Sequence, residues 1–308
     1  MKKFNIDFIK NKKYYFGISL GVILIGIIFN FIFGTELDIQ FTGGAIAKYS
    51  YINEVEETQL KEVIQNATDE IVAIQISKDM TSDNGRNVVS IEFSNNSEIS
   101  LDQQKELTSQ LTESFPDNEF EQLEISSVDS TMGRTFFLKC MTAIGIASVL
   151  MVLYVAFRFR KISGLSAGVM ALVALVHDVI MVYFSFIIFK MPLDDNFIAV
   201  VLMILGYSLN DTIVIYDRIR ENKKIMDKKT PLRDLVNHSI NQTLKRTLNT
   251  SISTLIAILT VLVVALIFNL SSVVSFALPM SIGIISGCYS SICIASPLWV
   301  MWKEHHDK

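Results

Sequence analysis

The chain has 308 residues, half of them hydrophobic, and a mean hydropathy of +0.40. This composition excludes an ordinary soluble globular protein and indicates a membrane protein. The net charge of −4 says little, because the charges are unevenly placed along the chain. We expect no nucleic-acid partner.

Six segments are long and apolar enough to cross a hydrocarbon core, which requires about 20 helical residues. They cover residues 14–33, 135–157, 164–189, 197–216, 247–268 and 273–302. The last segment is over-long and contains Pro279 and Pro297, so we expect it to kink or tilt. The predicted organisation is an N-terminus (1–13), a first transmembrane helix (14–33), an external domain (34–133), a five-helix transmembrane bundle (134–302) and a C-terminus (303–308).

A cleaved signal peptide is an alternative interpretation of the first segment. Five lysines precede it, and "AIA" at 45–47 resembles a cleavage site. Its apolar run of about 20 residues is nevertheless longer than the ~7–15 residues of a signal-peptide core. We therefore expect an uncleaved first span.

Lysine and arginine in the short loops predict the orientation. They are frequent before the first span, between spans two and three, and between spans four and five. The alternate loops hold Lys190 after span three and no basic residue between spans five and six. Both termini are therefore predicted to be cytoplasmic, and residues 34–133 to lie outside the cytoplasm.

The external domain is acidic and has an α+β pattern. Residues 34–133 contain 20 acidic and 5 basic residues, a net charge of −15. Alternating apolar residues and helical periodicity follow in the order strand, helix, strand, strand, helix, strand. That order predicts a ferredoxin-like domain. Nothing in it resembles a metal site or a nucleophile with its base, so we expect neither an enzyme nor a cofactor.

Polar side chains inside the predicted spans are the candidate functional residues. His177 and Asp178 lie near the middle of span three, and Asn210 and Asp211 in the cytoplasmic half of span four. An acid at the centre of a membrane helix costs ~2.5–3.5 kcal/mol on insertion scales, so it normally faces the bundle interior and has a partner. For Asp211 the predicted partner is Arg246, which opens span five at the same boundary. A purely structural ion pair is the alternative.

Adjacent helical residues point ~100° apart, so His177 and Asp178 are not expected to share one partner. One is expected to contact span four and the other to form a hydrogen bond elsewhere, with a packing role as the alternative. Span five also has a side of small polar residues, which allows close helix contact or lines a hydrated path: Thr247, Asn249, Thr250, Ser251, Ser253 and Thr254. The pairs Gly17/Gly21 and Gly283/Gly287 are predicted helix-packing positions.

These groups suit proton movement. Small changes in geometry could switch a buried aspartate beside an arginine between its charged and neutral forms. Deprotonated Asp211 would hold Arg246, and protonated Asp211 would release it and let spans four and five shift.

Four stretches of the sequence carry a resemblance to a known family. They are "GYSLNDTIVIYDRIREN" (206–222), "ALVHD" (174–178), "LKRTLNTS" (244–251) and "LDIQFTGG" (37–44), which contains Asp38, Gly43 and Gly44. With the six spans and one external domain after the first, the chain resembles the SecF family, the smaller membrane subunits of the SecDF complex of bacterial protein export.

The resemblance implies a six-span half that pairs with SecD in a fold similar to the resistance-nodulation-division exporters. It implies a bacterial cytoplasmic membrane, the SecYEG channel and an exported polypeptide as further partners, and membrane lipid around the helices. The family uses the proton motive force to draw secreted proteins outward, and some relatives use sodium instead. Asp211 and Arg246 match the family's ion-coupling residues, and Asp178, His177 and Asn210 are further candidates.

Two other classes of function remain open. A passive assembly or scaffold factor would use the same polar groups only to fix helix packing. A small-molecule exporter of the same superfamily would carry much larger external domains and twelve spans. Ion dependence separates the first alternative from an ion-driven export subunit.

Overall fold

The computed structural model describes residues 6–68, 72–78, 86–93, 101–128, 130–227, 229–268 and 270–306. Its helices and strands are α1 (Lys12–Phe33), α2 (Ile39–Thr42), β1 (Gly44–Tyr51), α3 (Glu57–Thr68), β2 (Val72–Lys78), β3 (Asn87–Phe93), α4 (Leu101–Ser114), β4 (Glu121–Val128), α5 (Ser130–Arg158), α6 (Gly164–Ile188), α7 (Asp195–Ile225), α8 (Leu232–Ile267), α9 (Ser271–Ser290) and α10 (Ser296–His306). Short 3-10 turns at Pro116–Asn118 and Arg160–Ile162 and a π-helical segment at Ser291–Ala295 also occur.

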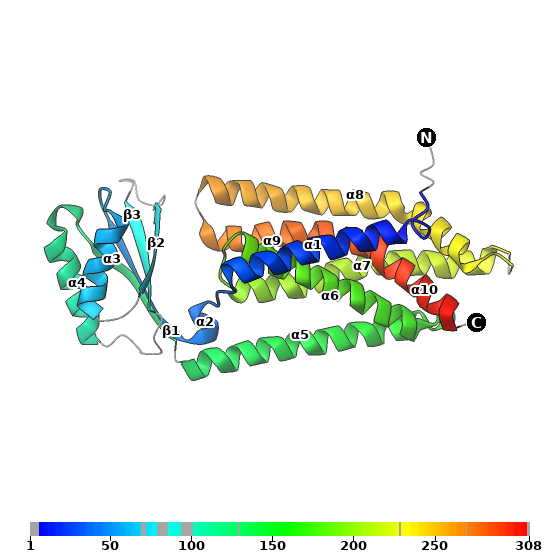
Figure 1. Cartoon of the computed structure of the whole chain (residues 1–308), viewed down its shortest axis with the longest axis horizontal. Helices are drawn as coiled ribbons and strands as arrows, with labels where there is room; N and C mark the ends of the chain where they lie inside the picture. The colour runs from blue at the N-terminus through cyan, green and yellow to red at the C-terminus, as the bar shows by residue number, and fades with distance from the viewer. Residues whose placement is uncertain are drawn as a thin grey trace. The chain divides into compact units, whose positions relative to one another are not determined.

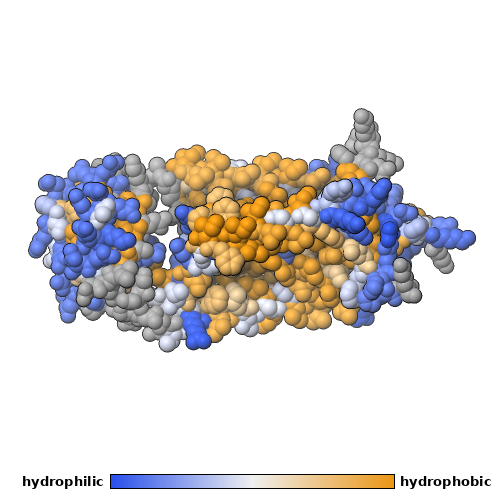
Figure 2. Space-filling view, in the orientation of Figure 1, coloured by the Kyte–Doolittle hydropathy of each residue, from blue (hydrophilic) through white to orange (hydrophobic). Residues whose placement is uncertain are grey.

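The chain forms two compact units. The helical unit contains Met1–Glu36, Thr142–Val264 and Ser272–Lys308. The second unit contains Leu37–Met141 and Ala265–Ser271, and therefore the whole β-sheet. Figure 2 shows that the exposed surface of the membrane-type helices is mostly hydrophobic, whereas the α/β domain has a mostly hydrophilic surface.

Six helices among the described residues are long and apolar enough to cross a membrane, as predicted. They are α1, α5, α6, α7, α8 and the continuous stretch from α9 to α10 (Figure 1). Two are much longer than the predicted spans, because α7 continues to Ile225 and α8 begins at Leu232. Together they form a helical hairpin, whose two arms are joined by hydrogen bonds from Asn222 to Ser239 (2.9 Å) and from Arg218 to Gln242 (2.6 Å).

The helices divide into a central and a peripheral set. The most apolar stretches of α6, α7 and α9–α10 are 61%, 56% and 78% buried, whereas those of α1, α5 and α8 are each 11% buried. The central helices therefore form the core of the bundle. The outer helices expose apolar side chains that suit contact with lipid or with another membrane subunit.

The sixth span is interrupted, as its prolines predicted. Pro279 lies inside α9 without ending it, but the π-helical segment Ser291–Ala295 comes directly before α10, which contains Pro297. Pro297 has no N–H to donate to the carbonyl of Cys293, which favours a local change of helix geometry. Figure 1 shows α10 continuing at an angle to α9.

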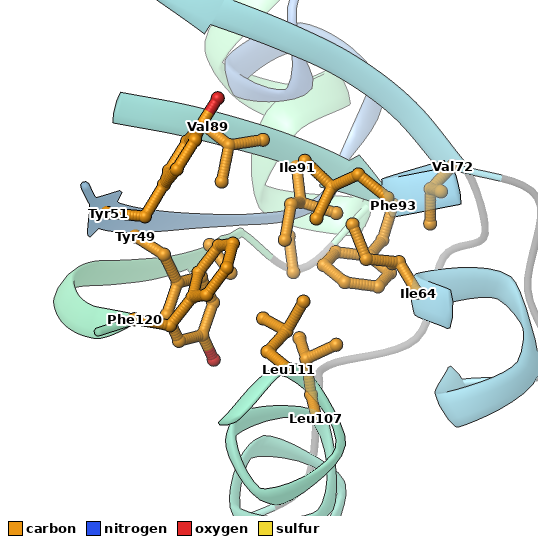
Figure 3. Packing of buried hydrophobic residues seen from close by; sticks show 13 residues of the cluster. Tyr49, Tyr51, Ile64, Val72, Val89, Ile91, Phe93, Leu107, Leu111 and Phe120 are labelled. Atoms are coloured by element: carbon orange, nitrogen blue, oxygen red, sulfur yellow. The ribbon is translucent and has the colours of Figure 1, made fainter. Parts of the chain in front are cut away.

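The α/β domain has one four-stranded antiparallel sheet in the order β2-β3-β1-β4. With α3 after β1 and α4 after β3, this is the ferredoxin-like arrangement that the sequence pattern predicted. Inward-facing residues of the strands meet one face of each helix, as Figure 3 shows for Tyr49, Ile91, Phe93, Ile64 and Leu111. All five are at most 1% exposed, so this domain has a hydrophobic core of its own.

Candidate functional site

Asp211 lies on the buried side of α7, facing α8. Asp211 is 2% exposed. The hydroxyl of Ser251 on α8 donates a hydrogen bond of 3.4 Å to Asp211 Oδ2. Among the described residues this is the one hydrogen bond to the Asp211 carboxylate, and its length is near the limit for such a bond. Asp211 is therefore buried at the contact of α7 with α8, with little hydrogen bonding.

The predicted ion pair between Asp211 and Arg246 is not formed, so that prediction is wrong for this structure. Arg246 is exposed, and none of the ion pairs between described residues includes it. The reason is the rotation of α8 about its axis. The face of α8 that packs on the bundle carries Thr243, Thr247 and Ser251, and Arg246 points ~100° away from Thr247.

Asp178 of α6 has the opposite environment. It is 0% exposed and accepts four hydrogen bonds. Ser208 of α7 and Ser290 of α9 donate to Oδ2, each at 2.7 Å, while Ser286 of α9 donates to Oδ1 at 2.6 Å. His177 Nδ1 lies 3.2 Å from Oδ1. Four partners match the number of hydrogen bonds that a carboxylate can accept, so the Asp178 side chain connects three helices.

This network explains how two adjacent residues of α6 can act together. We predicted that His177 and Asp178 would not share a partner; in the structure Asp178 contacts span four as expected, but His177 bonds to Asp178 itself. His177 is 8% exposed, and its Nε2 has no hydrogen-bond partner among the described residues.

A second set of contacts extends the network along α7. The hydroxyl of Ser291, in the π-helical segment, donates to the carbonyl oxygen of Ser208 at 3.0 Å. Thr212, the neighbour of Asp211, donates to the Ser291 hydroxyl at 2.9 Å. The side of α7 that faces α6 and α9 is therefore fixed by hydrogen bonds on both sides of Asp211.

The glycine pairs behave differently from each other. A Cβ added at Gly287 of α9 would lie 3.0 Å from Ser208 Cβ, and one at Gly283 would lie 2.6 Å from Ile204. These glycines allow the close approach of α9 to α7, as predicted. A Cβ added at Gly17 or Gly21 of α1 would have no neighbour within 4 Å among the described residues, so these two glycines are not packing positions against another helix of this chain.

Asn210 and the motif after the first span do not join this site. Asn210 is exposed on α7. Asp38 caps α2 by accepting a hydrogen bond from the backbone N–H of Gln40 at 2.8 Å. Gly43 and Gly44 follow at positive φ angles of 82° and 139°, which favour glycine. This motif turns the chain from α2 into β1, a structural role.

The serines of this network were not singled out from the sequence. Ser286 and Ser290 are one helical turn apart on α9, and Ser208 lies inside the "GYSLND" motif. Their four-residue spacing beside a glycine pair is the signal that could have identified them. Among the described residues, no group of three or more His, Cys, Asp or Glu side chains is placed to hold a metal ion.

The comparisons with known proteins agree with the resemblance of the motifs. The family model for "Protein export membrane protein SecD/SecF, C-terminal" matches residues 107–305. The chain is 30% identical over 306 residues to the protein translocase subunit SecF of Alicyclobacillus acidocaldarius, covering 98% of this chain and 94% of that protein. It is also 30% identical to the protein translocase subunit SecDF of Bacillus subtilis. That match covers 98% of this chain and 39% of the longer protein.

Solved structures give the same relation. The crystal structure of SecDF, a translocon-associated membrane protein from Thermus thermophilus, matches with a TM-score of 0.79 and 30% identity. The match covers 97% of this chain and 39% of that chain, so the chain corresponds to about two fifths of the SecDF proteins. With a family model over most of its length and full-length relatives that are SecF subunits, this chain belongs to the SecD/SecF family of protein-export membrane proteins, as a SecF.

Proposed function

We propose that this chain works with a SecD partner as an accessory subunit of the Sec protein-export machinery, and that the pair uses the proton motive force to complete the translocation of secreted proteins. The names of its relatives support this function. The longer SecDF relatives support a SecD partner, because the chain corresponds to 39% of their length. SecYEG, the exported polypeptide and the surrounding lipid of the bacterial cytoplasmic membrane complete the proposed set of partners.

Asp211 is the proposed coupling acid, and its poor hydrogen bonding is the observation that carries the proposal. A charged aspartate in a membrane helix costs several kcal/mol unless it has a partner. Asp211 is 2% exposed and receives a single hydrogen bond of 3.4 Å from the described residues. The protein therefore does little to stabilise the charged form, as expected of a site that takes up an ion and releases it again. Protons are the first candidate, and sodium is the alternative.

The proposed roles of the other candidates follow from their environments. Arg246 and Asn210 are exposed on helix faces adjacent to the Asp211 site, where they can reach a partner subunit or, after a rotation of α8, Asp211 itself. In the proposed cycle, ionised Asp211 pairs with Arg246 and protonated Asp211 leaves it. Asp178 and His177 hold α6, α7 and α9 together.

The proposed orientation has both termini in the cytoplasm. At one end of the helical unit, the N-terminal segment contacts α8 through hydrogen bonds from the backbone N–H of Phe8 to Asn237 (2.9 Å) and of Ile6 to Asn241 (3.0 Å). Arg233 of α8 forms an ion pair with Glu304 of α10 at the same end. Both termini and the basic α7–α8 hairpin therefore share one end of the bundle (Figure 1), which supports a common side of the membrane.

The test is a reconstitution of this chain with SecD in vesicles that contain the export channel. Proton flux and late-stage export across an imposed gradient are measured for wild type, for Asp211→Asn, and for Asp195→Asn. Asp195 is an exposed acid at the first residue of α7, far from the hairpin, so its variant is the matched control. We expect both activities to be lost in Asp211→Asn and retained in the control. Export that continues at full rate in Asp211→Asn would indicate a scaffold instead.

A further inference from the structure

The facing residues of α7 and α8 define an antiparallel register. Asp211 meets Ser251, Arg218 meets Gln242, and Asn222 meets Ser239. Because the helices are antiparallel, higher residue numbers on α7 and lower residue numbers on α8 both lie closer to the hairpin. The facing pairs therefore fix the position of every other interface residue along the helix axes.

Tyr207 and Thr247 lie on opposite sides of the Asp211–Ser251 contact. Tyr207 is four residues before Asp211, one helical turn away from the hairpin and on the same face of α7. Thr247 is four residues before Ser251, one turn toward the hairpin and on the face of α8 that packs on the bundle. Along the helix axes toward the hairpin, the polar groups of this interface therefore come in the order Tyr207, then Asp211 with Ser251, then Thr247.

Both outlying hydroxyls are buried and unpaired. Tyr207 Oη and Thr247 Oγ1 have no hydrogen-bond partner among the described residues, and Thr247 is 2% exposed. This contrasts with Thr250 and Thr254 on the same helix, whose hydroxyls donate to the carbonyls of Arg246 and Thr250 at 3.0 Å each. A buried hydroxyl without a partner has lost its hydrogen bonds to water and gained none in return. Such groups are typically satisfied by internal water.

We propose that Tyr207 and Thr247 hold water along the α7–α8 interface, so that Asp211 exchanges its proton with the outer side through Tyr207 and with the cytoplasmic side through Thr247. This inference rests on the proposed function. Each hydroxyl can donate and accept at once. In every transfer one O–H bond forms as a neighbouring O–H bond breaks: the water beside Tyr207 gives a proton to the Asp211 carboxylate and takes one from the water behind it. On the other side, Asp211 gives its proton to the water beside Thr247, and that water passes one of its own protons to the next water toward the cytoplasm.

Removal of each hydroxyl in reconstituted complexes tests the path. Tyr207→Phe and Thr247→Val keep the shape of the side chain and remove the hydroxyl. We expect either change to slow proton flux about tenfold, which corresponds to ~1.4 kcal/mol in an activation barrier. Thr247→Ser restores the hydroxyl and should restore most of the flux. The matched controls are Tyr154→Phe and Thr260→Val, both at exposed positions, which should leave the flux unchanged.

The outcomes separate this inference from the proposed function. Flux that is lost in Asp211→Asn but normal in both hydroxyl variants would overturn the path and leave Asp211 as the coupling acid. Absence of flux in wild type would overturn the proposed function and the proton-carrying role of the path together. Loss of flux in Thr247→Val without recovery in Thr247→Ser would show that packing, and not the hydroxyl, is required.

Water access can be measured without any activity. In a chain whose three cysteines are replaced by alanine, Tyr207→Cys and Thr247→Cys should react with a hydrophilic, membrane-impermeant thiol reagent. Ile252→Cys is the control, because in the register it lies between the two positions in height while its side chain is 51% exposed on the apolar outer face. We expect it to react at least about tenfold more slowly, since thiolate formation is suppressed in an apolar environment. Equal reactivity at all three positions, or none at Tyr207 and Thr247, would overturn the hydrated path.

Discussion

The two buried aspartates of the helical bundle are held in opposite ways. Asp178, at the contact of α6, α7 and α9, accepts four hydrogen bonds at 2.6–3.2 Å. Asp211, at the contact of α7 and α8, accepts one at 3.4 Å. Both are at most 2% exposed, so burial alone does not distinguish them. What differs is the number of donors that the neighbouring helices present to each carboxylate.

This difference indicates which side of α7 is fixed and which can move. On one side, Ser208 and Thr212 bond to α6 and the π-helical segment, and Gly287 lets the axes of α7 and α9 come close. On the other side, the membrane part of α8 contacts Asp211 through one long hydrogen bond. A change in the charge of Asp211 should therefore displace α8 against a fixed α6–α7–α9 core.

Removal of the Asp178 carboxylate should have the largest effect on stability. Asp178→Ala leaves three serine hydroxyls and His177 without their acceptor, and breaking a buried charged network typically costs ~3–5 kcal/mol of the free energy of unfolding. The measurement is unfolding of the purified protein in mixed micelles by denaturing detergent. Asp195→Ala, at an exposed position, is the control. A loss below about 1 kcal/mol would contradict the anchoring role, because surface changes alone produce effects of that size.

Much of the architecture was predictable because it depends on one-dimensional patterns. Span number follows from runs of apolar residues, and the ferredoxin-like order follows from periods of 2 and 3.6 in residues 34–133. The helix ends were less accurate. The α7–α8 hairpin is polar and charged outside the predicted spans, so a criterion based on membrane hydropathy stops at 216 and resumes at 247.

The candidate site was predictable in part. Asp178 and Asp211 were identified because a charge in an apolar run requires an explanation. Their partners depend on the rotation of each helix about its axis, which one sequence does not contain. Arg246 was therefore assigned to Asp211 only because the two residues lie at a similar depth in the membrane. Ser251, five residues later, is the one whose side chain points toward Asp211. The serines around Asp178 are neutral and common in membrane helices, so only the four-residue spacing of Ser286 and Ser290 beside the glycine pair could have identified them.

The close approach of α9 to α7 can be tested at Gly287. Gly287→Ala places a Cβ 3.0 Å from Ser208 Cβ, which should push the helices apart and lengthen the hydrogen bonds to Asp178. Overpacking of this kind costs ~1–3 kcal/mol. Gly206→Ala is the control, because a Cβ there meets nothing within 4 Å; in a helix, alanine is ordinarily favoured over glycine by ~1 kcal/mol. Equal behaviour of the two variants in detergent unfolding would show that the contact is not tight.

A single donor to Asp178 should have a smaller effect. Ser290→Ala removes the hydroxyl that lies 2.7 Å from Oδ2 and leaves the other three donors in place. Hydrogen bonds in membrane proteins average ~0.6 kcal/mol with values up to ~1.7, and we expect about 1 kcal/mol here because this hydrogen bond is short and buried. Ser253→Ala, at an exposed position of α8, should change the free energy of unfolding by less. An effect as large as that of Asp178→Ala would mean that Ser290 holds the helices by itself.

Neutralisation of Asp211 should have the smallest effect on stability, and this is the sharpest test of the contrast. Asp211→Asn removes a buried charge that has one long hydrogen bond, so the lost interaction and the relieved cost of burying the charge nearly offset each other. We expect the free energy of unfolding to change by less than about 1 kcal/mol, or to rise. The same substitution at Asp178 should destabilise the protein clearly, because an amide cannot accept four hydrogen bonds. The two variants change the same atoms, so equal destabilisation in the unfolding experiment would mean that Asp211 is as well satisfied as Asp178. A small effect on stability together with loss of proton flux would instead identify Asp211 as a residue kept for its charge change and not for the fold.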